Sequence, residues 1–222
     1  MVAEDIVKEV KKYGYCIFNL APETIESLRT MDLTKLEDGF HVNNSEHCAA
    51  VKDISELNTL ISSIKSVCKS EKTAWNIINV IRVVKQKSFE KYRTHYDSHL
   101  YTLVVPLQAS AEADILKGQL YLAPNLRRQP KTDIVNFVQK IFAFKWKGKS
   151  GYKKLEALNK IKLFDLQFGE AILFNGSRSL HGNLANESHE TRITMITHMA
   201  DPFPNGIGAF MRKLRKATGL RK

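Results

Sequence analysis

Cysteine is scarce in this chain, and the few cysteines present do not form a recognisable pair. Cys16, Cys48 and Cys68 are odd in number and far apart, and no C-x-x-C motif occurs. The sequence therefore predicts neither a disulfide framework nor a zinc ribbon. A reducing, cytoplasmic setting is the expectation that follows.

Long apolar runs are also missing. No stretch approaches the roughly 18–20 apolar residues of a membrane-spanning helix, and the N-terminal residues lack the apolar core of a signal peptide. Of the 222 residues, 43% are hydrophobic and 26% are charged. This composition excludes a disordered chain, a collagen and a coiled coil, and it is typical of a globular domain. We expect a single domain over residues 1–206.

Acidic residues are rare in two segments, which makes both segments strongly basic. The chain has a net charge of +11: residues 126–162 carry +9, residues 211–222 carry +6, and the remaining residues sum to −4. Such patches attract nucleic acid, membrane surfaces or acidic glycans, and solubilising segments without a partner are the alternative. Residues 207–222 also place apolar residues at helical spacing, which predicts a basic amphipathic tail for peripheral membrane contact or for docking on the domain.

Hydrophobic spacing predicts helices at the start of the chain and mainly strands after them. The expected helices span residues 2–13, 22–31 and 54–69. The expected strands span residues 15–18, 75–84, 100–108, 119–122, 169–174 and 191–197. Within the basic insertion 126–162 we expect a helix over 134–142 and a mobile loop over 145–154. This order predicts an α+β, mainly β domain built on an antiparallel sandwich or barrel.

Two potential metal ligands, His95 and Asp97, lie between two of the predicted strands. Side chains two residues apart in extended backbone share a face, so both can point at one site. One imidazole and one carboxylate are two-thirds of the facial triad that binds ferrous iron and leaves three positions open. His181, beyond the strand at 169–174, is the candidate third ligand. A histidine satisfied within its own loop is the alternative.

A candidate anion site follows eleven residues after His181. Arg192 opens the strand at 191–197, and a guanidinium that points into a barrel is costly unless it meets an anion. The planar fork of arginine suits a carboxylate. Thr194 shares the face of Arg192 and offers a hydroxyl to the same carboxylate. An arginine in a surface ion pair is the alternative.

These residues, taken in order, resemble the motifs of the Fe(II)- and 2-oxoglutarate-dependent oxygenases. The shared pattern is His95-x-Asp97, a strand that begins with Gly-Glu, His181, and then Arg192-x-Thr194. The spacing H-G-x-x-x-N-x-S…R from His181 onward is similar to that of phytanoyl-CoA-dioxygenase-like members. The resemblance implies a double-stranded β-helix, or jelly roll, with N-terminal helices packed on one sheet.

The resemblance also implies cofactors and roles for particular residues. His95, Asp97 and His181 would bind the catalytic Fe(II), while Arg192 and Thr194 would bind the cosubstrate 2-oxoglutarate. Asn79 would contact the cosubstrate from its strand, and a buried structural amide is the alternative. The implied reaction consumes O2 and hydroxylates an unactivated C–H bond, and the protein supplies coordination geometry and a shielded pocket.

The substrate class stays open among three hypotheses. The first is a hydroxylase that acts on an anionic small molecule or an acidic glycan. The second is a nucleobase hydroxylase, in which the basic insertion and its aromatic residues hold DNA or RNA. The third is a non-enzymatic jelly-roll binding protein whose histidines are incidental.

Overall fold

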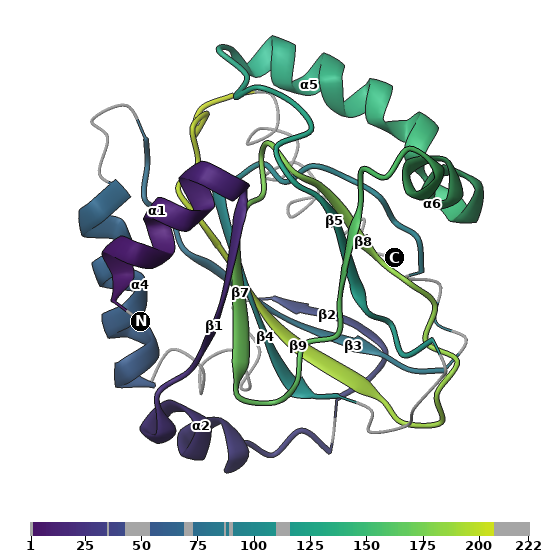
Figure 1. The fold of residues 1–222 in the computed structure, drawn as a ribbon. Helices are drawn as coiled ribbons and strands as arrows, with labels where there is room; N and C mark the ends of the chain where they lie inside the picture. The colour runs from purple at the N-terminus through teal and green to yellow at the C-terminus, as the bar shows by residue number, and fades with distance from the viewer. Residues whose placement is uncertain are drawn as a thin grey trace.

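Two antiparallel sheets face each other in the computed structural model, and helices cover the outer side of the larger sheet (Figure 1). The structure describes residues 2–34, 36–42, 54–68, 73–86, 88, 91–109 and 116–206. The tail expected at 207–222 lies outside these ranges. Within them, no helix combines the length and the apolar character needed to cross a membrane.

The larger sheet has six strands in the order β1-β7-β4-β9-β3-β2. Its strands are β1 Tyr15–Asn19, β2 Gly39–Val42, β3 Ile78–Val84, β4 Tyr101–Gln108, β7 Glu170–Asn175 and β9 Arg192–Met199. The smaller sheet has the order β6-β5-β8. Its strands are β5 Leu120–Ala123, β6 Lys162–Phe164 and β8 Leu180–Asn183. This mixture of helices and antiparallel sheets is consistent with a jelly roll and agrees with the predicted fold class.

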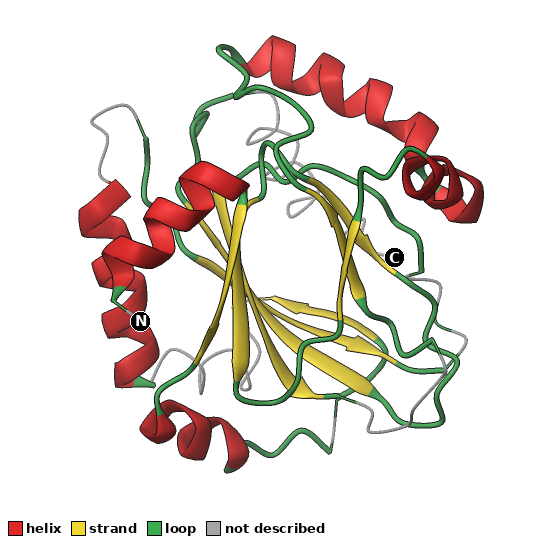
Figure 2. Cartoon of the chain, in the orientation of Figure 1, coloured by secondary structure: helices red, strands yellow, loops and turns green. Residues whose placement is uncertain are grey.

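Three N-terminal helices flank the larger sheet, as Figure 2 shows. They are α1 Ala3–Tyr13, α2 Pro22–Arg29 and α4 Ser55–Cys68. Helix α1 buries the apolar residues that recur at helical spacing, among them Ile6 and Val10. It ends where Gly14 takes a left-handed conformation with φ of 88°. The predicted packing of N-terminal helices on one sheet is therefore present.

Alternate residues of the larger sheet belong to two separate cores. Leu103 of β4 and Leu173 of β7 pack against the helices, together with Ile81 and Met195. Val104 and Ile172, their neighbours in sequence, belong to a second cluster that lies between the two sheets. The period of two residues in a strand produces this division.

Most of the expected elements are present, with shifts of a few residues at their ends. The three N-terminal helices and the six expected strands all form, although β3 begins at Ile78 instead of residue 75. The helix expected over 134–142 is α5 Asp133–Phe142. The short strands β2, β6 and β8 were not predicted as separate strands, because three or four residues give little periodicity.

The prediction of a mobile loop over residues 145–154 is wrong. A 3-10 helix, η1 Ala143–Trp146, and a helix, α6 Gly148–Ala157, occupy this segment. Gly151 lies so close to the backbone of Trp146 that a Cβ atom would collide with the Trp146 carbonyl. The glycine therefore permits close packing instead of flexibility, and Leu155 is buried one turn later.

Candidate active site

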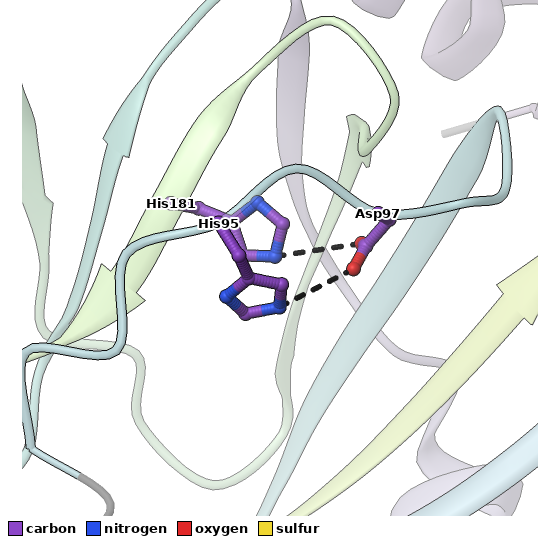
Figure 3. A group of neighbouring side chains, drawn as sticks. All are labelled: His95, Asp97 and His181. Carbon is purple, nitrogen blue, oxygen red and sulfur yellow. Dashed lines mark ion pairs between the residues drawn. The ribbon is translucent and has the colours of Figure 1, made fainter. Parts of the chain in front are cut away.

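A loop before β4 and the strand β8 bring His95, Asp97 and His181 together (Figure 3). His95 and His181 form an isolated antiparallel bridge, in which each backbone N–H donates to the carbonyl of the other, at 2.9 and 3.0 Å. The two imidazole rings therefore lie side by side, with centroids 4.4 Å apart. The backbone N–H of Asp97 donates to the Gly176 carbonyl at 2.9 Å, which brings the carboxylate to the same site.

The three side chains converge on one point. The Nε2 atom of His95 lies 3.4 Å from Oδ1 of Asp97, and the Nε2 atom of His181 lies 3.4 Å from Oδ2. Ligand atoms bound at right angles to one metal ion, about 2.1 Å from it, are about 3 Å apart. The observed separations are close to that value. The side chain of His95 is 53% exposed, whereas those of Asp97 and His181 are 5% and 8% exposed, so the site opens to solvent beside His95.

Backbone carbonyls fix which imidazole nitrogens can bind a metal. Nδ1 of His95 lies 2.8 Å from the Arg93 carbonyl, and Nδ1 of His181 lies 3.0 Å from the Ser179 carbonyl. A carbonyl only accepts hydrogen bonds, so Nδ1 carries the proton in each neutral ring. The Nε2 lone pairs are then directed toward Asp97, as a metal-binding histidine requires.

Residues that the sequence did not single out surround the Asp97 carboxylate. The Thr102 hydroxyl donates to Oδ2 at 2.5 Å, and Nδ1 of His198 lies 3.6 Å from the same oxygen. Gly176 leaves room for the Asp97 carboxylate, since a Cβ atom at position 176 would lie 2.5 Å from Oδ2. Burial alone would raise the pKa of Asp97, but the positive charge that His181 and His198 carry when protonated holds that pKa well below its usual range. Asp97 is therefore ionised, as a metal-binding carboxylate must be.

The triad lines a cavity of about 100 Å³ that Arg192 and Thr194 also line. Both belong to β9, where alternate residues point into the cavity and the residues between them face the helices. Arg192 is 6% exposed. Burial and the nearby Arg82 lower the pKa of Arg192 to about 9, so the guanidinium stays charged at neutral pH. The negative charge of Asp165 offsets this lowering only in part, and a small anion in the cavity would compensate the charge of Arg192.

The cavity contains a second arginine, Arg82 of β3, which the sequence patterns did not single out. Its guanidinium donates to Oδ1 of Asn183, whose amide donates in turn to the Gly118 carbonyl at 2.9 Å. This network holds Arg82 on the cavity wall near Arg192. The available signal was a single charged residue in the mainly apolar strand INVIRVV, because such a strand buries any charge it carries.

Asn79 lies on the opposite face of β3, which corrects the expectation that it contacts a cosubstrate. Ile81 and Val83 of the same strand pack in the helix-covered core, whereas Arg82 lines the cavity. Asn79 shares the register of Ile81 and Val83, and its Oδ1 accepts from the Thr197 hydroxyl at 2.8 Å. Its amide is part of the contact between β3 and β9.

The donor set of the cavity fits a ferrous ion and a dicarboxylate. Two neutral imidazoles and one carboxylate on one side of an ion form the facial triad that favours non-haem Fe(II). A buried guanidinium with a neighbouring threonine hydroxyl fits a carboxylate. One wall of the cavity is thus suited to a metal, and β9 presents an anion site to the same space.

Comparisons with known proteins reveal similarity in structure and none in sequence. No family model matches the chain, and no curated protein sequence matches it. A prolyl-4-hydroxylase from Pseudomonas putida is 12% identical, with a TM-score of 0.56 over 89% of this chain and 98% of that one.

Two further matches are to complexes with small molecules. EvdO2 from Micromonospora carbonacea var. aurantiaca, complexed with 2-oxoglutarate, is 11% identical, with a TM-score of 0.58 over 89% of this chain and 90% of that one. The epimerase SnoN, in complex with Fe3+, alpha ketoglutarate and nogalamycin RO, is 13% identical, with a TM-score of 0.56 over 90% and 83%. The chain thus has the fold of the Fe(II)- and 2-oxoglutarate-dependent oxygenases.

Proposed function

We propose that the chain is an Fe(II)- and 2-oxoglutarate-dependent oxygenase that hydroxylates an unactivated C–H bond of an anionic small molecule or an acidic glycan. The observation that carries this proposal is the presence of a His-Asp-His triad and a buried arginine in one cavity. A structural metal would explain the triad but not the arginine. A simple anion site would explain the arginine but not the convergence of the three ligands.

The triad, the anion site and the apolar wall of the cavity each have a defined task in this proposal. His95 and His181 bind the metal through Nε2 and Asp97 binds it through its carboxylate, while Arg192 and Thr194 bind the far carboxylate of 2-oxoglutarate. When bound, iron and 2-oxoglutarate supply the oxidising chemistry, with O2 as the oxidant. The apolar side chains of Leu120, Phe174 and Ile196 line the same cavity and limit the access of water.

The segment between His181 and Arg192 supports a phytanoyl-CoA-dioxygenase-like member of this fold. Its polar residues hold the turn that leads into β9. The Asn186 amide donates to the Val84 carbonyl at 2.9 Å and to the Glu190 carbonyl at 3.0 Å, and the Ser188 hydroxyl accepts from the Glu190 N–H at 2.9 Å. These contacts connect the turn to β3 and so help to place Arg192 in the cavity.

Positive charge at the mouth of the cavity supports an anionic substrate. Arg93 is exposed and lines the cavity beside His95. Lys147 lies close enough that burial and the charge of Arg93 both lower the pKa of Lys147. Arg93 beside the solvent-facing His95, with Lys147 near Arg93, favours carboxylate, phosphate or sulfate groups.

An anaerobic titration tests the proposal. Ferrous iron and then 2-oxoglutarate are added to metal-free protein, and the visible absorption is recorded. We expect a weak charge-transfer band that needs both additions. Folded protein that gives no band would exclude the oxygenase and support the binding-protein hypothesis. Succinate release is then screened with acidic metabolites, acidic glycans and oligonucleotides. Turnover with oligonucleotides alone would replace the proposed substrate class by nucleic acid.

A further inference from the structure

Helix α5 turns its polar side toward the domain and its apolar side outward. Asn136 is its buried residue, and Gln139 and Lys140 are half-buried. In contrast, Ile134 is 66% exposed and Phe142 is 67% exposed. A surface helix normally buries its apolar stripe and exposes its polar residues. The orientation of α5 is therefore the reverse of the usual one.

The exposed apolar residues lie along one side of α5, and Phe144 of η1 continues the series. Within α5 they recur at spacings of three and four residues, which places them on one side of a helix. Figure 1 shows α5 on the outside of the molecule, away from the six-stranded sheet. We name this strip the α5–η1 surface, and it consists of Ile134, Val135, Phe137, Val138, Ile141, Phe142 and Phe144, each at least 42% exposed. Contiguous apolar surface of this kind marks an interaction site, whereas scattered apolar residues do not.

Polar contacts hold α5 in this orientation. The Arg127 guanidinium donates to Oδ1 of Asn136 and to Oε1 of Gln139, both at 2.9 Å, and it also lies over the Tyr96 ring at 4.0 Å. The Lys140 ammonium donates to the Ser98 hydroxyl at 2.7 Å. Tyr96 and Ser98 flank Asp97 in sequence, so α5 is fastened to the loop that carries two of the three metal ligands.

Basic side chains border the apolar strip. The Lys147 ammonium lies 3.6 Å from the centroid of the Phe144 ring, and the Lys145 ammonium lies 5.2 Å from that of the Trp146 ring. Lys131 is exposed just before α5 begins. Residues 126–162 contain eleven basic residues and two acidic ones. The surface therefore combines exposed apolar side chains with a strong positive charge.

We propose that the α5–η1 surface docks on an anionic lipid bilayer. Apolar side chains on one side of a helix enter the boundary between headgroups and acyl chains, and flanking lysines contact anionic headgroups. The charge argues against a second copy of the chain, because a symmetric contact would bring two segments of +9 together. It also argues against residues 211–222, which carry +6. Nucleic acid would match the charge, but it would leave the aliphatic side chains uncovered.

Vesicle cosedimentation of the full chain tests this proposal, and it needs neither iron nor turnover. One set of vesicles is pure phosphatidylcholine, and the other contains equal parts of phosphatidylcholine and phosphatidylglycerol. We expect binding to the anionic vesicles that weakens as salt is raised. The double variant Phe137→Ser/Phe142→Ser should weaken it about tenfold or more, because two apolar anchors are lost. The variant Lys145→Gln/Lys147→Gln should weaken it by about 30-fold, at roughly 1 kcal/mol per lysine.

A matched control separates this surface from exposed apolar residues in general. Ile17 and Ile77 are 39% and 43% exposed and lie outside α5 and η1, so Ile17→Ser/Ile77→Ser should bind like the unmodified chain. Absence of binding to anionic vesicles would overturn the proposal. Binding that persists in Phe137→Ser/Phe142→Ser but disappears on removal of residues 207–222 would assign it to the tail instead. A dimer that this double variant dissociates, without vesicle binding, would identify a second copy as the partner.

Discussion

The two faces of the six-stranded sheet differ in chemistry although they belong to the same strands. Toward the helices, Ile81, Leu103 and Met195 form a fully buried apolar layer. Toward the smaller sheet, the neighbouring residues Arg82, Thr102 and Thr194 line the cavity. Adjacent positions in a strand therefore serve separate purposes, one face stabilising the fold and the other building the site. Substitutions on the two faces should affect different measurements.

The largest expected effect is on the cavity side of this comparison. We expect His181→Ala to lower 2-oxoglutarate turnover more than about 100-fold, because a lost ligand costs more than a lost hydrogen bond to a ligand. The free energy of unfolding of the metal-free protein should change little, since the site borders a cavity. His189→Ala is the control, since His189 is exposed and outside the cavity. Turnover that survives in His181→Ala would remove this residue from the metal site.

Leu103→Ala should have the opposite effect to His181→Ala: it should lower stability and leave the metal site intact. Leu103 is fully buried in the core between the sheet and the helices. We expect a loss of about 2–5 kcal/mol in the free energy of unfolding, because the truncation leaves a cavity. Iron affinity should stay the same in the fraction that remains folded. Urea unfolding measures the change, and Leu158→Ala, on an exposed residue, is the control, with an expected change of about 0.5 kcal/mol or less. A Leu103→Ala variant of full stability but weakened iron binding would contradict the separation of the faces.

Arg192→Ala should raise the KM for 2-oxoglutarate about 10- to 100-fold, the equivalent of a lost hydrogen bond to a charged group. The dissociation constant for iron should stay within about twofold, since Arg192 does not contact the triad in this proposal. Arg192→Lys should recover part of the loss, because lysine keeps the charge but lacks the planar fork. Arg178→Ala is the control for a general change in charge, since Arg178 does not line the cavity. An equal rise in the KM for 2-oxoglutarate in Arg178→Ala would show that net charge alone is responsible.

The sequence predicts the parts of the site that form local patterns. His95 and Asp97 are two residues apart, and Arg192 and Thr194 repeat that spacing, so extended backbone alone aligns each pair. The residues that complete the environment of Asp97 come from elsewhere in the chain. Gly176 is far from Asp97 in sequence, and its role is to leave space, because a Cβ atom there would collide with the carboxylate. Such a contact depends on the packing of two sheets and leaves no local pattern.

Orientation is the property that sequence patterns specify least. The apolar spacing of α5 predicts a helix correctly, but it does not show that the apolar side faces outward. The contacts of Arg127 with Asn136 and Gln139 decide that orientation. The β3 strand raises the same difficulty, because nearly all of its residues are buried. A strand buried on both faces lacks the alternation of polar and apolar residues that would assign each side chain to a face.

Asn79 is a residue of β3 that the sequence alone did not assign to the correct face. Its substitution has the smallest effect that we expect. Asn79 is a polar residue on the stabilising face. Its substitution should therefore lower the free energy of unfolding, as that of Leu103 does, but by a smaller amount. We expect Asn79→Ala to cost about 1 kcal/mol in the free energy of unfolding, because one buried hydrogen bond to the Thr197 hydroxyl is lost. The KM for 2-oxoglutarate should stay unchanged, in contrast to Arg192→Ala. A double-mutant cycle with Thr197→Val should show coupling between the two residues. A raised KM without loss of stability would return Asn79 to the cavity and would break the division between the two faces.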